Sequence, residues 1–240
     1  TIDRAPERCD KEHFCSITQD CNSVTGRCES AQSGWRELPP LPTPRGYCCA
    51  VYHEGAVFVF GGVLEMDPTK GFVPPIAAAE RFDFASQRWS SLTSIPVPVL
   101  ASRCLALRDR LYVIGGRVSV DYRRSDNSNI VQVFDPASNS WEAAPRMNRP
   151  RAWAGAVVQD GKIYVTGGSG VRTQQTPNGY EASTEVFDPA MQQWRLLPAQ
   201  LGAGRYMLGM ISLSAGIYAA GGSSFSAPEQ TYRNDSFEQI

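Results

Sequence analysis

The chain has 240 residues, 42% of them hydrophobic, so it can bury a substantial core, and an all-β fold of this size is often a single domain. Its 23 basic and 24 acidic residues give a formal net charge of −1, which indicates neither a nucleic-acid partner nor an anionic-membrane surface. The apolar runs have the length of strands, such as residues 56–60, and none reaches the ~20 residues of a membrane helix. We therefore expect no membrane insertion.

The first 34 residues are polar, lack apolar periodicity and contain four of the seven cysteines: Cys9, Cys15, Cys21 and Cys28. So short a segment cannot be ordered by burial alone and needs a staple. Two disulfides would provide it, in any of three pairings. A zinc knuckle that also uses His13, or free thiols, are the alternatives. The spacers of five, five and six residues are wider than the usual zinc-binding pairs, so we predict a disulfide-stapled segment over residues 1–34.

The remaining chain carries an internal repeat with a period of about 53 residues. Four glycine pairs mark it: Gly61-Gly62, Gly115-Gly116, Gly167-Gly168 and Gly221-Gly222. Four tryptophans have nearly the same spacing: Trp35, Trp89, Trp141 and Trp194. We interpret the glycines as structural, because a side chain would fit neither the backbone conformation nor the crowding expected there.

The third repeat shows the strand pattern most clearly. It predicts strands over residues 152–158, 162–166, 184–187 and 193–197, and Asp160-Gly161 forms a hairpin turn between the first two. Four short antiparallel strands per repeat make a four-stranded sheet. Such sheets repeated around an axis make a β-propeller, so we expect residues 35–240 to form one.

An aromatic-Asp turn fills the same place in three repeats: Phe82-Asp83, Phe134-Asp135-Pro136 and Phe187-Asp188-Pro189. With the strand that ends in Gly-Gly and the spaced tryptophan, this pattern resembles the kelch repeat. The resemblance implies an all-β, kelch-type β-propeller of four repeats, preceded by the small Cys-rich arm. It also implies that the strand rich in small residues is innermost and the tryptophan strand outermost.

The phase of the repeats bears on the number of blades. The chain enters on an outer strand at Trp35, runs through three complete repeats and ends on a third strand near residues 235–238. The N-terminus could thus supply the missing outer strand of the last blade. We predict a closed four-bladed ring, with a part of a larger propeller as the alternative.

Strand order places two sets of loops on one side of the propeller, which we call the loop face. These are the loops that enter the innermost strands and the long loops after each Gly-Gly, at 63–79, 117–129, 169–183 and 223–234. Long loops on a rigid scaffold commonly carry recognition. We therefore expect ligands to bind on the loop face.

Arginine stands at the start of the inner strand in three repeats, as Arg45, Arg151 and Arg205, whereas Val99 takes this slot in the fourth. Resemblance to kelch substrate adaptors implies that these arginines line a central pocket and bind acidic peptide motifs. Guanidinium groups bind carboxylates through paired hydrogen bonds. We add Arg117, Arg172 and Tyr206 from adjoining positions to this candidate binding set. The alternative is that the three arginines pair with backbone carbonyls or acidic side chains around the channel.

The sequence gives little support to catalysis. The only histidines are His13 and His53, so we expect no catalytic residues, no metal site and no cofactor. The leading hypothesis is a non-enzymatic scaffold that binds a protein or acidic peptide. The alternatives are an enzyme or small-ligand binder for an acidic sugar or carboxylate at the arginine pocket, and a structural subunit of a larger assembly.

The cysteines also bear on the compartment. Residues 21–28 resemble EGF-like modules of extracellular proteins, which favours an extracellular, secretory or periplasmic location, with an intracellular scaffold as the alternative. Cys48, Cys49 and Cys104 fall on predicted inner strands, where we expect buried free thiols. A disulfide between Cys48 and Cys49 is the alternative. The oligomeric state is left open.

Overall fold

The computed structural model divides into two compact units, Thr1–Leu38 and Pro39–Ile240. The first unit contains an antiparallel pair, β1 (Gln19–Asn22) and β2 (Arg27–Ser30), in which Cys21 stands opposite Cys28. The expected disulfide partners Cys9 and Cys15 lie outside the described residues. The structure describes residues 19–22, 27–30, 37–65, 74–119, 126–174, 176, 178–224 and 237–240.

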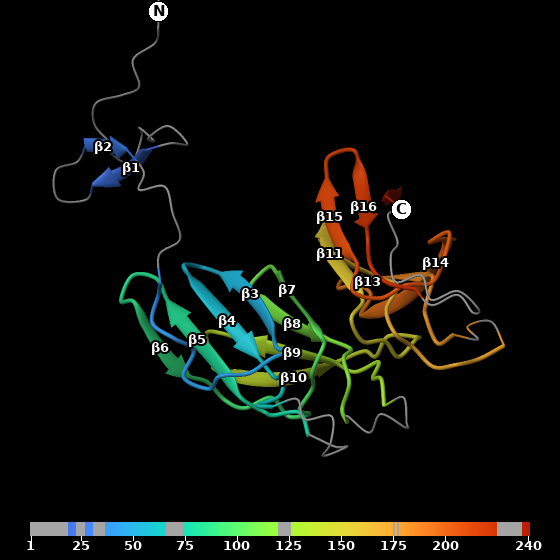
Figure 1. Ribbon diagram of the computed structural model, residues 1–240, viewed down its shortest axis with the longest axis horizontal. Coiled ribbons are helices and arrows are strands. Elements are labelled where there is room, and N and C mark those ends of the chain that lie inside the picture. Colours follow the sequence, from blue (N-terminus) through green and yellow to red (C-terminus); the bar gives the residue numbers. More distant parts are fainter. Residues whose placement is uncertain are drawn as a thin grey trace, which may run out of the picture. The chain divides into compact units, whose positions relative to one another are not determined.

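The second unit is built from four antiparallel sheets, which we call blades 1 to 4 and which follow one another along the chain (Figure 1). Blade 1 comprises β3 (Cys49–His53), β4 (Ala56–Phe60), β5 (Ala79–Asp83) and β6 (Arg88–Ser91). Blade 2 comprises β7 (Arg103–Leu107), β8 (Arg110–Ile114), β9 (Val131–Asp135) and β10 (Ser140–Ala144). Blade 3 comprises β11 (Gly155–Gln159), β12 (Lys162–Thr166), β13 (Ser183–Asp188) and β14 (Gln193–Gln200). Blade 4 comprises β15 (Gly209–Leu213), β16 (Gly216–Ala220) and β17 (Phe237–Gln239).

The predicted all-β propeller of four repeats is confirmed. Neighbouring inner strands contact one another in the order β3, β7, β11 and β15. The part of the chain that the structure describes contains no helix long and apolar enough to cross a membrane.

The core lies between blades rather than inside them. Phe58 and Phe60 of blade 1 pack with Leu111 and Phe134 of blade 2. A second cluster joins residues of blades 2 and 3, among them Ile114 and Ile163. A blade covered on both faces buries consecutive apolar residues, which explains why β4 and β8 are almost uniformly buried rather than alternating.

The ring closure that the repeat phase predicts is not formed by the described residues. Tyr52 on β3 and Ile211 and Leu213 on β15 should face each other across a closed ring, yet they are 63%, 52% and 48% exposed. The predicted outer strand around Trp35 lies outside the described residues. The four blades therefore form an open arc. The phase of the repeat predicts how many strands of each kind are present, but ring closure also depends on the angle between neighbouring blades, which the phase does not predict.

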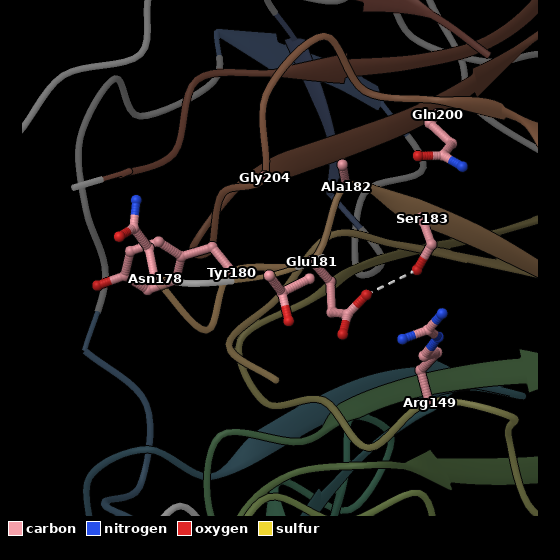
Figure 2. Close-up of a pocket in the computed structure, with 9 residues that line it drawn as sticks. Arg149, Asn178, Tyr180, Glu181, Ala182, Ser183, Gln200 and Gly204 are labelled. Carbon is pink, nitrogen blue, oxygen red and sulfur yellow. Dashed lines mark hydrogen bonds between the residues drawn. The ribbon is translucent and has the colours of Figure 1, made fainter. Parts of the chain in front are cut away.

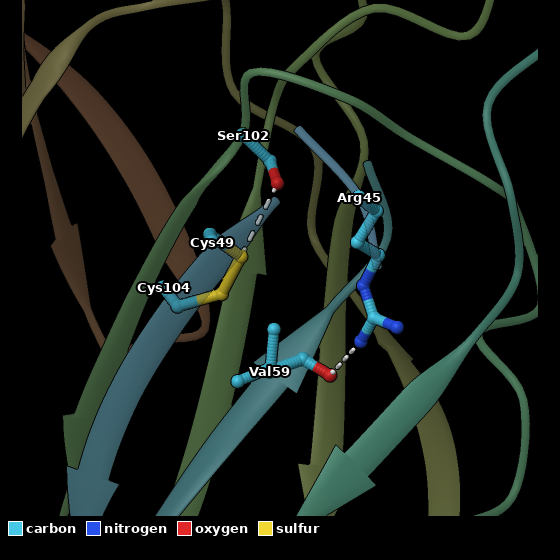
Figure 3. The surroundings of a disulfide bond; sticks show 5 residues. All are labelled: Arg45, Cys49, Val59, Ser102 and Cys104. Carbon is cyan, nitrogen blue, oxygen red and sulfur yellow. Dashed lines mark hydrogen bonds between the residues drawn. A yellow bond between two sulfur atoms is a disulfide. The ribbon is translucent and has the colours of Figure 1, made fainter. Parts of the chain in front are cut away.

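A disulfide joins Cys49 on β3 to Cys104 on β7 across the interface of blades 1 and 2 (Figure 3). The Ser102 hydroxyl donates a hydrogen bond to Cys49 Sγ at 3.3 Å, and Cys48 is a partly buried free thiol. The expectation of free thiols is therefore wrong for Cys49 and Cys104, and so is the alternative of a Cys48–Cys49 bond. Packing of the inner strands brings the two Cα atoms to 5.6 Å, within bridging distance.

The Gly-Gly pairs lie where each blade contacts the next. All eight of these glycines have positive φ, the region in which glycine is favoured. A side chain on Gly115 would overlap the Arg151 carbonyl of the following blade, and one on Gly167 would come within 2.7 Å of the Arg205 carbonyl. Backbone atoms of the next blade cannot move away, so these glycines allow the blades to pack closely.

We expect Gly115→Ala to lower the free energy of unfolding by about 2 kcal/mol or more. Gly161→Ala is the matched control, because Gly161 also has positive φ, at 69°, but has open space around its Cα. It should cost only the conformational term, about 1 kcal/mol. Urea denaturation of both variants measures the difference, and equal losses would show that crowding at the blade interface contributes nothing.

Candidate functional site

The three predicted slot arginines are buried inside their own blades. Arg151 and Arg205 are 1% and 0% exposed, and the Arg45 side chain is equally buried. Each pairs with a glutamate on the third strand of the same blade. The pairs are Arg45–Glu80 at 2.5 Å, Arg151–Glu185 at 2.9 Å and Arg205–Glu238 at 2.6 Å.

The pair in blade 3 is the most completely hydrogen-bonded. Glu185 accepts hydrogen bonds from the Asn148 backbone and side-chain amides, from the Arg149 backbone N–H and from Arg151 Nη2. Burial lowers the pKa of Arg151, and the negative charge of Glu185 opposes that shift. Through these four hydrogen bonds the Glu185 carboxylate on β13 holds the loop before β11, while Arg151 Nε stays without a partner.

Blade 2 replaces both members of this pair. Val99 occupies the arginine slot, and Gln132 stands where the other blades have glutamate. The Gln132 side chain accepts from the Val97 N–H at 2.8 Å and donates to the Val97 carbonyl at 3.0 Å. In the blade that lacks the arginine, a neutral amide thus replaces the glutamate, as expected if the ion pair serves to stabilise its own blade. The placement matches the alternative of pairing with acids and carbonyls, and the ligand-binding role of Arg45, Arg151 and Arg205 stays a prediction.

In each blade one residue with a left-handed backbone lies two positions before the inner strand. We call these four the hub residues: Tyr47, Ala101, Trp153 and Met207. All four have φ between 51° and 57°, which is unusual for bulky residues. The N–H groups of Ala101, Trp153 and Met207 each donate to the carbonyl of the hub residue in the preceding blade, at 2.8–2.9 Å. These bonds between blades hold the hub backbone in its left-handed conformation.

An aromatic row extends outward from the hub and consists of the hub residues Tyr47 and Trp153 followed by Tyr206 and Tyr180. Successive ring centroids are 6.2, 6.2 and 5.1 Å apart, and the Tyr206 and Tyr180 rings are stacked. The predicted Arg117 places its guanidinium 5.7 Å from the Trp153 ring centre. Burial raises the pKa of Tyr180, and Tyr206 adds to the shift. The row supplies rigid apolar contact area on the loop face.

A pocket of about 400 Å³ opens on the loop face next to this row (Figure 2). Three segments form it: the loop before β11, the long loop between β12 and β13, and the loop between β14 and β15. Its lining residues are Arg149, Thr176, Asn178, Tyr180, Glu181, Ala182, Ser183, Gln200 and Gly204. The loops that the sequence assigned to recognition therefore do enclose a pocket.

The pocket has one cation whose charge is not engaged. Within the described ranges the Arg149 guanidinium makes no hydrogen bond and no ion pair, and Arg149 is only partly buried. Glu181, in contrast, is 3% exposed and accepts a hydrogen bond from Ser183 Oγ at 2.9 Å. The same hydroxyl accepts from Arg151 Nη2 at 3.0 Å, so Ser183 connects Glu181 to the buried arginine. Arg149 is therefore the group available to an anionic ligand.

Sequence reasoning missed Arg149 and Tyr180. Arg149 stands two residues before the slot arginine, in the segment Asn148-Arg149-Pro150-Arg151, and has no counterpart in the repeat pattern. Of the predicted set, Tyr206 stacks on Tyr180 in the pocket wall, and the charge of Arg172 acts on Tyr180. Arg45 and Arg117 lie in other blades. Among the described residues no three His, Cys, Asp or Glu side chains are grouped as a metal site would need.

The fold and the repeated blade interfaces define a β-propeller protein. The KLHDC2/KLHL20/DRC7 Kelch-repeats domain model matches residues 28–222, which is most of the chain. The chain belongs to the kelch-repeat family, and the resemblance seen in its sequence is confirmed.

Individual relatives agree with this assignment. The chain is 31% identical over 160 residues to Beta-scruin of Limulus polyphemus, covering 65% of this chain and 16% of that protein. It is 30% identical over 190 residues to Kelch-like protein 40 of Mus musculus, covering 79% and 28%. It therefore spans less than a third of the length of either. The solved structure of YjhT shares the fold with a TM-score of 0.67 at 17% identity, over 80% of this chain and 64% of that one.

Proposed function

We propose that the chain is a non-enzymatic protein-interaction module that binds an acidic segment of a protein partner on its loop face. A carboxylate of the partner enters the pocket and pairs with Arg149. The observation that carries this proposal is the unengaged guanidinium of Arg149 in a pocket whose other charged group, Glu181, is already hydrogen-bonded.

The chemistry of the pocket suits a carboxylate. A guanidinium is planar and binds a carboxylate through two parallel hydrogen bonds. Asn178 and Gln200 contribute side-chain amides to the lining of the same pocket. The aromatic row beside the pocket offers the kind of rigid surface that interface hot spots use, with Tyr47 42% exposed.

Ser183 Oγ donates to the Glu181 carboxylate and accepts from Arg151, so its hydroxyl belongs to the buried hydrogen-bond network around the slot arginine. The second candidate function is binding of a small acidic sugar or free carboxylate, favoured by the pocket volume of about 400 Å³. Both candidates use Arg149, and the size of the bound molecule distinguishes them.

A matched pair of peptides tests the proposal. We expect a short acetylated peptide with a central glutamate to bind, and its glutamine counterpart to bind about tenfold more weakly or worse, because the charge-assisted pair is lost. Arg149→Ala should abolish the preference for glutamate. Tyrosine and tryptophan fluorescence, or amide chemical shifts, report binding.

Arg195→Ala is the control, because Arg195 is an exposed arginine on β14 that is not part of the pocket wall. It should bind the glutamate peptide as the native chain does. Equal affinity for the two peptides in the native chain would refute the acidic-partner proposal. Binding of free glucuronate or acetate at the same concentration as the peptide would favour the small-ligand candidate.

We also propose an oxidising compartment for the protein. The Cys49–Cys104 disulfide supports this, because disulfides persist in exported proteins and are reduced in the cytosol.

A further inference from the structure

The wall of the pocket continues into an apolar surface on the loop face. The Tyr180 ring lines the pocket and stacks on the Tyr206 ring, with the two centroids 5.1 Å apart. The Trp153 ring follows, 6.2 Å from Tyr206 in an edge-to-face contact. All three side chains are only partly buried, so part of each remains accessible to solvent. A molecule that fills the pocket therefore lies beside accessible aromatic surface.

Val171 adds an aliphatic side chain at the mouth of the pocket. It is 42% exposed, and its carbonyl accepts a hydrogen bond at 2.7 Å from the hydroxyl of Thr176, which lines the pocket. A backbone hydrogen bond at 2.7 Å, from the Gly170 N–H to the Gly179 carbonyl, holds the two sides of this loop together. The position of Val171 is thus fixed while its side chain stays exposed. We call the following four residues the apolar rim: Trp153, Val171, Tyr180 and Tyr206.

The side chains of the apolar rim are suited to contact a partner. An aromatic side chain has only two torsions and loses little conformational freedom when a partner covers it. Packing already orders the Tyr180 and Tyr206 rings, whose planes differ by 15°. Removing apolar surface from water is favourable in proportion to its area. The rim therefore favours an aliphatic or aromatic side chain of the partner over a polar one.

The rim begins one side-chain step away from the pocket. In an extended segment, the side chains at positions i and i+2 point to the same side and are about 7 Å apart. The Tyr206 ring lies 5.1 Å from the Tyr180 ring in the pocket wall. A step of two residues from a carboxylate in the pocket thus reaches the rim, whereas the side chain of the residue between them points to the opposite side.

We propose that the partner segment is extended and carries an apolar side chain two residues away from the acidic residue that pairs with Arg149. This inference rests on the proposed function, because the pair between Arg149 and a carboxylate sets the register of the segment. The apolar side chain packs against the apolar rim. The partner sequence is therefore mixed, with one acidic and one apolar position on the same side of the segment, rather than uniformly polar and acidic.

Three capped pentapeptides test the spacing on the native chain: Leu-Ser-Glu-Ser-Leu, Ser-Leu-Glu-Leu-Ser and Ser-Ser-Glu-Ser-Ser. The first two have the same composition and charge, and differ only in whether leucine stands two residues or one residue from the glutamate. Leucines on both sides make the test independent of the direction in which the segment runs. We expect the first peptide to bind about tenfold more tightly than either of the others. Amide chemical shifts measure the affinities.

A variant of the rim connects the leucine effect to the site. Val171→Ser should reduce the advantage of Leu-Ser-Glu-Ser-Leu severalfold and leave the affinity for Ser-Ser-Glu-Ser-Ser unchanged, because only apolar contact is removed. Met191→Ser is the matched control, since Met191 is 69% exposed on the turn before β14 and is not part of the rim. It should keep the full advantage. Circular dichroism checks that both variants fold, as expected for substitutions at exposed positions.

The glutamine counterpart of the first peptide separates this inference from the proposed function. Equal affinity for the two leucine peptides, with the preference for glutamate over glutamine intact, would overturn the apolar spacing and leave the acidic-partner proposal standing. An advantage that Val171→Ser leaves unchanged would overturn the role of the rim in the same way. Equal affinity for the glutamate and glutamine peptides would overturn both proposals.

Discussion

Glu185→Ala is expected to lower the free energy of unfolding by about 3–5 kcal/mol, one of the two largest effects that the structure predicts. Removing the carboxylate leaves the fully buried Arg151 without its counter-ion, and it leaves the Asn148 and Arg149 N–H groups without their acceptor. An uncompensated buried charge costs far more than an ion pair contributes. Urea denaturation followed by tryptophan fluorescence measures the loss.

Blade 2 provides the control for this prediction. The double variant Arg151→Val, Glu185→Gln copies the Val99 and Gln132 arrangement into blade 3. The new glutamine can bond the Arg149 backbone as Gln132 bonds that of Val97. We expect the double variant to recover stability to within about 1–2 kcal/mol of the native chain. If it were less stable than Glu185→Ala alone, the arginine would be doing something other than bracing its blade.

Replacing both Cys49 and Cys104 by alanine should cost about 4 kcal/mol of unfolding free energy. The disulfide closes a loop between positions 55 residues apart, and the entropy of an open loop of that length in the unfolded chain sets this magnitude. Reductant should destabilise the native chain by a similar amount and leave the double variant unchanged.

Cys48→Ala is the matched control, because Cys48 is the neighbouring free thiol. Its midpoint should stay close to the native one in the absence of reductant. Thiol counting by alkylation under denaturing, non-reducing conditions checks the bond itself. Labelling of both Cys49 and Cys104 would contradict the disulfide and the proposed oxidising compartment.

The strands were predictable because their signals are local. The Asp160-Gly161 turn and the Gly-Gly pair fix β12, which is found at the predicted residues, Lys162–Thr166. β11 begins at Gly155, three residues later than expected, because the hub residue Trp153 has a left-handed backbone that cannot join a ladder. Nothing in the local sequence indicates that conformation, since it depends on a hydrogen bond to the preceding blade.

The site was less predictable because its chemistry is set by contacts between distant segments. The sequence shows Arg45, Arg151 and Arg205 in register, but not that Glu80, Glu185 and Glu238 neutralise them from the third strand. The repeat pattern predicted the buried arginines as the binding residues. It did not indicate Arg149, because the other repeats have no arginine at the corresponding position. The Cys49–Cys104 bond was missed for the same reason, since it needs the register between two blades.

One titration tests the central claim, that Arg149 recognises the ligand whereas the slot arginines brace the blades. The glutamate peptide is titrated into Arg149→Ala and into the double variant Arg151→Val, Glu185→Gln. We expect Arg149→Ala to remain as stable as the native chain and to lose the preference for glutamate, and the double variant to keep it. The reverse result, with binding lost in the double variant and retained in Arg149→Ala, would contradict the account.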